Sequence, residues 1–251
     1  MSKTLVIIPS KGRSEKIEKH TLSWLRKSGV PFIVMVEPQE VSLYERTLTN
    51  EEMLVLPDND RGICFSLFHG ADYARKNGYD YIFKMDDDVR NWIGESRRVD
   101  DKSHLHFLMT LSDCLPALEK PGVGAIGFLY SNEMFEVKKW IRVGYRFRTC
   151  YLIKTDLYHP DPELRTYEDW IHSLDVFLAN KEIVTYGKVG IDCAPVGKNK
   201  GGEQCFDRRQ KSLEAIEYLK GKYPMLQWKK TTGKNWDYEP DFSNISVSTK
   251  L

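Results

Sequence analysis

The chain has 251 residues, of which 41% are apolar and 29% are charged, which is ordinary for a globular protein long enough to bury a full core. Its formal net charge of only +1 excludes the global positive field that dominates non-specific DNA binding, so any contact with nucleic acid has to come from a local patch. Five widely spaced cysteines without a Cys-x-x-Cys pair argue against a disulfide framework and a structural zinc site, and they favour a reducing compartment.

The first third of the chain alternates between strand and helix signals. Apolar runs predict buried strands at residues 4–9, 31–36 and 53–57, and a further strand is predicted at residues 79–85, which are rich in apolar and aromatic residues. Helices are predicted between them, at residues 14–27, 39–48 and 63–77. Ser14 is expected to cap the first helix and Gly29 to end it. This alternation indicates parallel βαβ units in a doubly wound sheet, where ligands gather at the carboxyl ends of the strands.

The rest of the chain is less regular. Helices are predicted at residues 103–119, 168–180 and 205–223. Extended segments are predicted at residues 122–130, 138–156 and 183–192, the second of which reads as hairpin or antiparallel structure. We therefore expect one domain over residues 1–223, with a nucleotide-binding half at 1–90 and an acceptor half at 91–223. Residues 224–251 are polar and are expected to form a C-terminal arm on the surface.

The strand predicted at residues 79–85 runs directly into three adjacent carboxylates, Asp86, Asp87 and Asp88. Three neighbouring negative charges repel one another, so a cation should lie beside them. Mg²⁺ and Mn²⁺ take oxygen ligands, need only one or two carboxylates, and share their other positions with phosphate oxygens. If the backbone stays extended, Asp86 and Asp88 point the same way. The alternative is a solvated turn or helix N-cap that happens to be rich in Asp.

The order of motifs around this acidic trio resembles that of the GT-A nucleotide-sugar glycosyltransferases, in which the acidic motif is called DxD. The first strand ends in a segment from Pro9 to Arg13, residues 59–62 form a loop before the long helix, and residues 74–78 read Ala-Arg-Lys-Asn-Gly before the acidic strand. The match covers about residues 4–90. The resemblance implies an α/β fold of the GT-A (Rossmann-like) type, a mostly parallel sheet flanked by helices with a more antiparallel acceptor half.

The resemblance also implies a metal-dependent enzyme with a UDP-sugar as its donor substrate and Mn²⁺ or Mg²⁺ as its cofactor. Asp88 is expected to hold the metal, and Asp86 the metal, one of its waters or a ribose hydroxyl, with Asp87 in support. Asp192, at the end of an extended segment, is a candidate for a further metal ligand. A metal held there would stabilise the negative charge that develops on the departing nucleotide. Residues expected to contact the nucleotide are Pro9, Arg13, Asp60, Arg61, Asp86 and Asp87.

A second acidic pair, Glu168 and Asp169, opens a predicted helix. In inverting members of the family such a pair supplies the base that takes the proton of the acceptor hydroxyl. We expect Asp169 to be this base, with Glu168 beside it. The alternative is that both residues only favour the helix macrodipole and cap the helix.

The loop at residues 197–204 combines glycines with lysines. Gly201 and Gly202 could form an anion-binding nest, with Lys198 and Lys200 as counter-charges for the donor phosphates. A flexible loop that closes over the donor would also exclude water. An ordinary solvent-exposed loop with lysines is the alternative.

A narrower resemblance suggests the acceptor. It rests on the chain's size, the acidic trio at the strand end, the Glu168–Asp169 pair and the glycine-containing loop at 197–204. By these features the chain is most similar to small bacteriophage-type GT-A enzymes that modify hydroxymethylated pyrimidines in DNA, a group associated with base-modifying oxygenases. This implies transfer of glucose, or a pentose such as arabinose, to a flipped-out 5-hydroxymethylcytosine in phage DNA. Basic and aromatic residues interleave at 138–148 and could contact DNA, although an exposed strand shows the same alternation.

Two alternatives remain open. A GT-A enzyme with a saccharide or lipid-linked acceptor would bind the same donor and metal but show no salt-sensitive DNA binding. A nucleotidyltransferase, or a non-catalytic nucleotide-binding module, would share the sheet. The sequence has no segment long and apolar enough for a signal peptide or a membrane span and no sign of an obligate protein partner, so a cytoplasmic protein is expected, in the host cytoplasm if the chain is viral.

Overall fold

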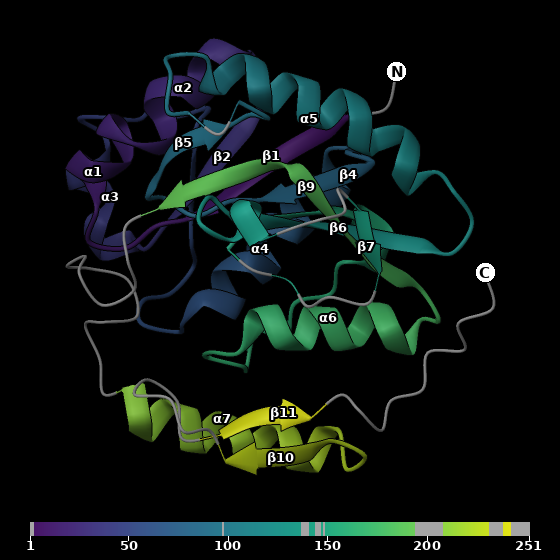
Figure 1. Cartoon of the computed structure of the whole chain (residues 1–251). Coiled ribbons are helices and arrows are strands. Elements are labelled where there is room, and N and C mark those ends of the chain that lie inside the picture. Colours follow the sequence, from purple (N-terminus) through teal and green to yellow (C-terminus); the bar gives the residue numbers. More distant parts are fainter. Residues whose placement is uncertain are drawn as a thin grey trace.

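The computed structural model describes residues 3–96, 98–136, 141–143, 147, 149–193, 208–230 and 238–241. Within these residues a mixed sheet of nine strands runs through the molecule, and helices cover both of its faces (Figure 1). The α/β prediction is confirmed, including a second half of the sheet that is more antiparallel than the first, although it also contains one parallel pair.

The first half of the sheet consists of four parallel strands, β1 (Thr4–Pro9), β2 (Phe32–Val36), β3 (Met53–Val55) and β4 (Tyr81–Lys84). Their order in space is β3-β2-β1-β4. The central strands β1, β2 and β4 are buried on both faces, which explains their continuous apolar sequences. Because the strands are parallel, the loop after β1 and the acidic trio after β4 meet at the same edge of the sheet.

The helices of this half differ from the prediction at two places. The helix expected at residues 14–27 is divided at His20 into α1 (Ser14–Lys19) and α2 (Thr21–Ser28). Ser14 is the first residue of α1 rather than its cap, so that expectation was wrong. Gly29 does end α2, with the left-handed φ of 67° that glycine adopts without strain.

The other helices of this half are a short 3-10 helix (Pro38–Glu40), α3 (Val41–Tyr44) and α4 (Ile63–Lys76). The helix expected at residues 39–48 is thus reduced to about one turn on either side of residue 41. The long helix expected at 63–77 is confirmed to within one residue.

The second half contributes β5 (Val89–Ile93), β6 (Val123–Tyr130), β7 (Ile141–Val143), β8 (Tyr151–Lys154) and β9 (Glu182–Cys193). Strand β8 lies antiparallel between β4 and β6, and β5 and β7 both pair antiparallel with β9. The extended, antiparallel structure expected at 138–156 is confirmed for β7 and β8, but the hairpin reading was wrong, because β7 pairs with β9 whereas β8 pairs with β4 and β6. The helices of the second half are α5 (Ser103–Leu118), α6 (Glu168–Leu178) and α7 (Arg208–Lys222).

Side-chain alternation along β4 divides the core into two layers. Phe83 packs with Trp24, Trp92 and Phe107 on the face covered by α2 and α5. Ile82 points to the opposite face and belongs to the layer under α4 and α6. Lys84 follows the alternation of Ile82 and therefore enters this second, apolar layer.

The C-terminal segment forms a small unit beyond α6 (Figure 1). Ala215, Ile216 and Leu219 of α7 pack against Ile171 and Leu174 of α6. The arm expected at 224–251 contains two strands that the sequence did not predict, β10 (Gln227–Lys230) and β11 (Tyr238–Asp241), paired antiparallel. Among the described residues, no helix has the length and apolar character needed to span a membrane.

Candidate functional site

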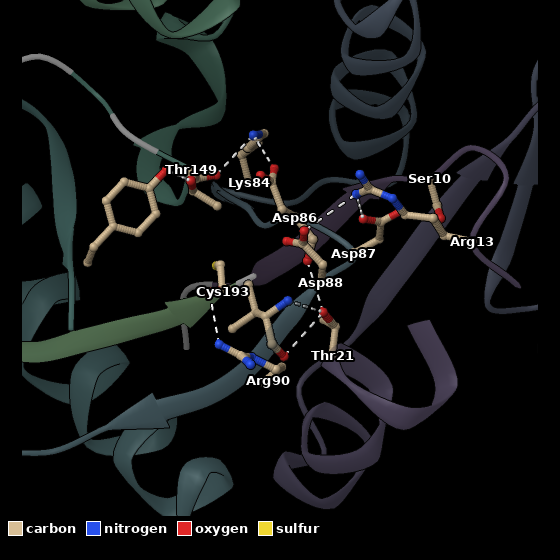
Figure 2. Close-up of polar contacts among 12 residues, drawn as sticks. Ser10, Arg13, Thr21, Lys84, Asp86, Asp87, Asp88, Arg90, Thr149 and Cys193 are labelled. Carbon is tan, nitrogen blue, oxygen red and sulfur yellow. Dashed lines mark hydrogen bonds and ion pairs between the residues drawn. The ribbon is translucent and has the colours of Figure 1, made fainter. Parts of the chain in front are cut away.

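The acidic trio lies where β4 leaves the sheet. Strand β4 ends at Lys84, the chain turns at Asp87 and Asp88, and β5 begins at Val89 (Figure 2). The extended backbone does not continue through the trio, so its side chains are not arranged by strand alternation. The turn is required because β5 has to reach β9 on the far side of the sheet. Each carboxylate consequently has a different environment.

Asp87 is buried and joins the turn to the loop after β1 (Figure 2). Its carboxylate accepts hydrogen bonds from Ser10 Oγ at 2.6 Å and from Arg13 Nη1 at 2.6 Å. The hydroxyl of Tyr44 lies 2.6 Å from Ser10 Oγ and extends the network to α3. Burial raises the pKa of Asp87 to about 6, although Arg13 and Ser10 act in the opposite direction. These contacts hold the turn after β4 against the loop after β1.

Asp86 is held by a lysine from inside the sheet. Lys84 is 2% exposed, and its Nζ donates to Asp86 Oδ1 at 2.5 Å and to the carbonyl oxygen of Thr149 at 2.9 Å (Figure 2). Burial alone would lower the pKa of Lys84, but the charges of Asp86 and Glu168 outweigh it, and the pKa is raised. The sequence predicted a cation beside the trio, and Lys84 and Arg13 are two such cations.

Asp88 and Asp192 were predicted to bind metal. Asp88 Oδ2 lies 3.6 Å from Arg13 Nη1 and its side chain is 13% exposed. Asp192, near the end of β9, accepts hydrogen bonds from Arg90 Nη2 at 2.6 Å and from Asn91 Nδ2 at 3.0 Å. The pairing of β5 with β9 produces these contacts, because it places Asn91 opposite Asp192.

A divalent cation at the turn after β4 would need oxygen ligands from these residues. Among the described residues, no three His, Cys, Asp or Glu side chains are grouped so that they could hold a metal ion. A nucleotide-bound Mg²⁺ or Mn²⁺ needs only one or two carboxylates, because phosphate and water supply its other ligands. Asp86 and Asp88 offer hard carboxylate oxygens of this kind at the carboxyl end of a parallel strand. The donor set therefore fits such an ion.

A second polar cluster lies at the same edge of the sheet, after β2 and β3. Lys11 Nζ donates to Glu37 Oε1 at 2.9 Å and forms an ion pair with Asp60. The backbone N–H of Asp60 also donates to Glu37 Oε1, at 3.1 Å. Asp60 has a left-handed φ of 57°, which is strained for a residue with a side chain and is often found at functional sites. Of the residues predicted to contact the nucleotide, Asp60 thus lies close to the loop after β1, which begins after Pro9 and leads to Arg13.

Arg61 points elsewhere. Its Nη2 lies 3.1 Å from Glu163 Oε1, its Nη1 lies 3.4 Å from Asp58 Oδ2, and its guanidinium stacks over the ring of Phe65. Arg61 therefore joins the loop before α4 to the loop before α6, whereas Asp60 belongs to the cluster around Lys11.

Glu168 and Asp169 open α6 as predicted. The preceding Tyr167 is buried and has a left-handed φ of 67°, so the entry into this helix is strained. The carboxylate of Asp169 accepts a hydrogen bond from the N–H of Trp170 at 3.0 Å. The charge of Glu168 acts on Lys84 and raises its pKa. The start of α6 and the acidic trio are therefore linked electrostatically through one buried lysine.

The remaining predicted site residues, Lys198, Lys200, Gly201 and Gly202, lie outside the described residues, as does most of the basic and aromatic stretch at 138–148. Sequence reasoning missed Ser10 and Lys84. A lysine inside the apolar strand that precedes the trio was the available signal for Lys84. The role of Ser10 had no such signal, because it depends on the loop after β1 meeting the turn after β4.

Comparison with known proteins gives a family match and several similar folds. A family model described as TET-Associated Glycosyltransferase matches residues 4–202. A search among curated proteins gives no match. The similar solved structures include mannose-1-phosphate geranyltransferase from Thermus thermophilus, which is 15% identical over 76% of each chain with a TM-score of 0.48. They also include 4-diphosphocytidyl-2C-methyl-D-erythritolsynthase from Anaerococcus prevotii, which is 13% identical over 87% of this chain and 96% of that one with a TM-score of 0.48.

The family match covers most of the described sheet, from β1 to β9, and includes the acidic trio and the Glu168–Asp169 pair. The chain therefore belongs to the TET-associated glycosyltransferase family and is a glycosyltransferase.

Proposed function

We propose that the protein transfers a sugar from a UDP-sugar to the hydroxymethyl oxygen of 5-hydroxymethylcytosine in DNA, with phage DNA as its natural acceptor. The observation that carries the proposal is the acidic turn after β4, which lies beside the loop after β1 and contains Asp87 held by Ser10 and Arg13. In a family of glycosyltransferases, this edge of the parallel strands is the expected place for a nucleotide.

The donor site is proposed to have two parts. The diphosphate lies at the acidic turn, where Asp88 and Asp86 would hold Mn²⁺ or Mg²⁺, with Asp192 as a further ligand. The ion would supply a Lewis acid that stabilises charge on the leaving phosphate. Pro9, Arg13, Asp60 and Arg61 are proposed to contact the nucleotide. The loop at residues 197–204 is proposed to close over the phosphates through Lys198, Lys200, Gly201 and Gly202.

Asp169 is proposed as the general base. The acceptor hydroxyl oxygen forms a bond to the anomeric carbon of the sugar while the bond from that carbon to UDP breaks. The hydroxyl proton passes to the Asp169 carboxylate, and the bonding electron pair leaves with UDP. Glu168, beside it in the chain, lies close enough to Lys84 for their charges to interact.

The acceptor is proposed from the family. Association with TET points to hydroxymethylated DNA bases as the substrate class. A hydroxymethyl group on a stacked base leaves little room for a donor sugar, so the base has to leave the duplex before transfer. The near-neutral net charge means that the DNA contacts come from a local surface, and binding is expected to weaken as salt increases.

The test is a transfer assay with radiolabelled UDP-glucose or UDP-arabinose, Mn²⁺, and two duplexes that differ only in 5-hydroxymethylcytosine or cytosine. We expect label in the hydroxymethylated duplex alone. Release of UDP without labelled DNA, or equal transfer to a free saccharide, would contradict the proposed acceptor. Absence of UDP release from every donor would contradict the proposed donor.

A further inference from the structure

Lys84 is an unusual residue for the centre of a sheet. Its side chain is 2% exposed and enters the layer that contains Ile82 and Tyr151. Lysine is rarely buried to this extent unless its charge is paired, because removal of an ammonium from water is costly. Such a residue therefore needs a specific reason to be there.

The contacts of Lys84 join the two halves of the domain. Asp86, which accepts one hydrogen bond, follows β4, the last parallel strand. Thr149, whose carbonyl oxygen accepts another, precedes β8, which is the first antiparallel strand beside β4. Lys84 is paired in register with Tyr151 of β8, and the ammonium lies 5.9 Å from the centre of the Tyr151 ring. Lys84 thus lies where the parallel half of the sheet, which ends at β4, meets the second half, which begins at β8.

A purely stabilising role does not explain this ion pair well. The energy lost on removing two charges from water commonly cancels their attraction, and apolar replacements of buried pairs are often neutral or stabilising. The ammonium can instead fix the orientation of the carboxylate that it contacts. It holds Asp86 Oδ1 at 2.5 Å, whereas the neighbouring carboxylates Asp87 and Asp88 would repel that side chain.

We propose that Lys84 is a positioning residue that fixes the Asp86 carboxylate in its donor-binding orientation and ties it to the acceptor half through Thr149. The proposal rests on the proposed function, because it assigns Lys84 a task in donor binding. Lys84 acts through Asp86 and does not touch the donor itself. Loss of the ammonium is therefore expected to weaken donor binding only as far as Asp86 contributes to it.

The test uses three variants: Lys84→Met, Asp86→Asn and the double variant that combines these two substitutions. Ile82→Ala serves as the control. Ile82 lies on the same strand and in the same layer, so Ile82→Ala creates a cavity and lowers stability without removing a charge. Binding of UDP with Mn²⁺ is measured by calorimetry, and thermal unfolding is recorded for every variant. We expect Lys84→Met to bind UDP with Mn²⁺ at least tenfold more weakly than the wild type, and Ile82→Ala to bind as the wild type does while unfolding at a lower temperature.

The double variant separates positioning from stability. If Lys84 acts through Asp86, the double variant binds UDP with Mn²⁺ no more weakly than Asp86→Asn alone. Lys84→Gln, which keeps a donor for the Thr149 carbonyl but carries no charge, serves as a second variant and is expected to show the same loss. Affinity within twofold of the wild type in Lys84→Met or Lys84→Gln, or additive losses in the double variant, would overturn the inference. Absence of UDP binding by the wild type would instead reject the proposed donor site, and the inference with it.

Discussion

Arg13 Nη1 lies 2.6 Å from Asp87 Oδ1 and 3.6 Å from Asp88 Oδ2, so one guanidinium from the loop after β1 faces two carboxylates of the turn after β4. The parallel pairing of β1 with β4 brings these two loops to the same edge of the sheet. The turn is therefore shaped by charges of the chain itself before any ligand binds.

Replacement of Arg13 by Met should destabilise the protein and weaken donor binding together. Asp87 would stay buried without its charged partner, and breaking a buried ion pair on one side costs about 3 kcal/mol in unfolding free energy. Urea denaturation measures this change. Arg26→Met is the matched control, because Arg26 pairs with Glu18 and Glu52 at a partly exposed site, where loss of a pair costs roughly 1 kcal/mol or less. Equal losses of unfolding free energy in Arg13→Met and Arg26→Met would contradict the role of Arg13 as the charged partner of buried Asp87.

Replacement of Asp169 by Asn should reduce sugar transfer by about two orders of magnitude, because the amide cannot take the acceptor proton. Binding of UDP should be unchanged, since Asp169 is not proposed to touch the donor. Asp175→Asn, six residues further along α6 at a carboxylate that Tyr223 contacts, is the control and should retain transfer within about twofold. If Asp169→Asn transfers the sugar at a near-normal rate and Glu168→Gln does not, the base is Glu168 and not Asp169.

The stability of the protein should fall in acid because of His172. Its Nδ1 lies 2.7 Å from the hydroxyl of Tyr151, and burial lowers the pKa of His172 to about 3, helped by the charge of Lys84. The pKa in the unfolded chain is 6.5, so between these values only the unfolded state takes up the proton. The contribution of His172 is therefore complete above pH 6.5 and is lost as the pH falls toward 3.

The measurement is the unfolding free energy of the wild type and of His172→Gln between pH 4 and pH 7. Their difference should change by up to about 1.4 kcal/mol per pH unit below pH 6.5, with the wild type losing more. The charged and titratable neighbours Lys84, Tyr151, Tyr158 and Glu168 are present in both proteins, so their effects largely cancel. Parallel curves for the two proteins would show that His172 does not titrate in this way.

Much of the fold could be predicted because its signals are local. The buried strands β1 and β2 are continuous apolar runs, and Gly29 ends α2 in the conformation that its residue type favours. The interruption at His20 could not be predicted from local signals. It places Thr21 against the turn after β4, and the Thr21 hydroxyl donates to the carbonyl oxygen of Asp86 and accepts from the N–H of Val89. Such a contact depends on segments far apart in the sequence.

The candidate site was predictable in position but not in geometry. The carboxyl end of β4 was predicted from the apolar run that precedes the acidic trio. The direction of each carboxylate was not, because it depends on three partners from different parts of the chain: Ser10, Arg13 and Lys84. Strand β5 was missed for a similar reason. It is short, it contains Arg90 and Asn91, and its pairing partner β9 lies about a hundred residues away.

We propose that the turn after β4 binds the donor through a divalent cation, and the decisive test of this proposal is the Asp88→Ala variant. Release of UDP from a UDP-sugar is measured with Mn²⁺ for the wild type and for this variant, with circular dichroism to show that the fold is retained. Asp58→Ala, at an exposed carboxylate in the loop before α4, is the control. We expect no measurable UDP release by Asp88→Ala and normal UDP release by Asp58→Ala. Release by folded Asp88→Ala at the wild-type rate would contradict the proposal.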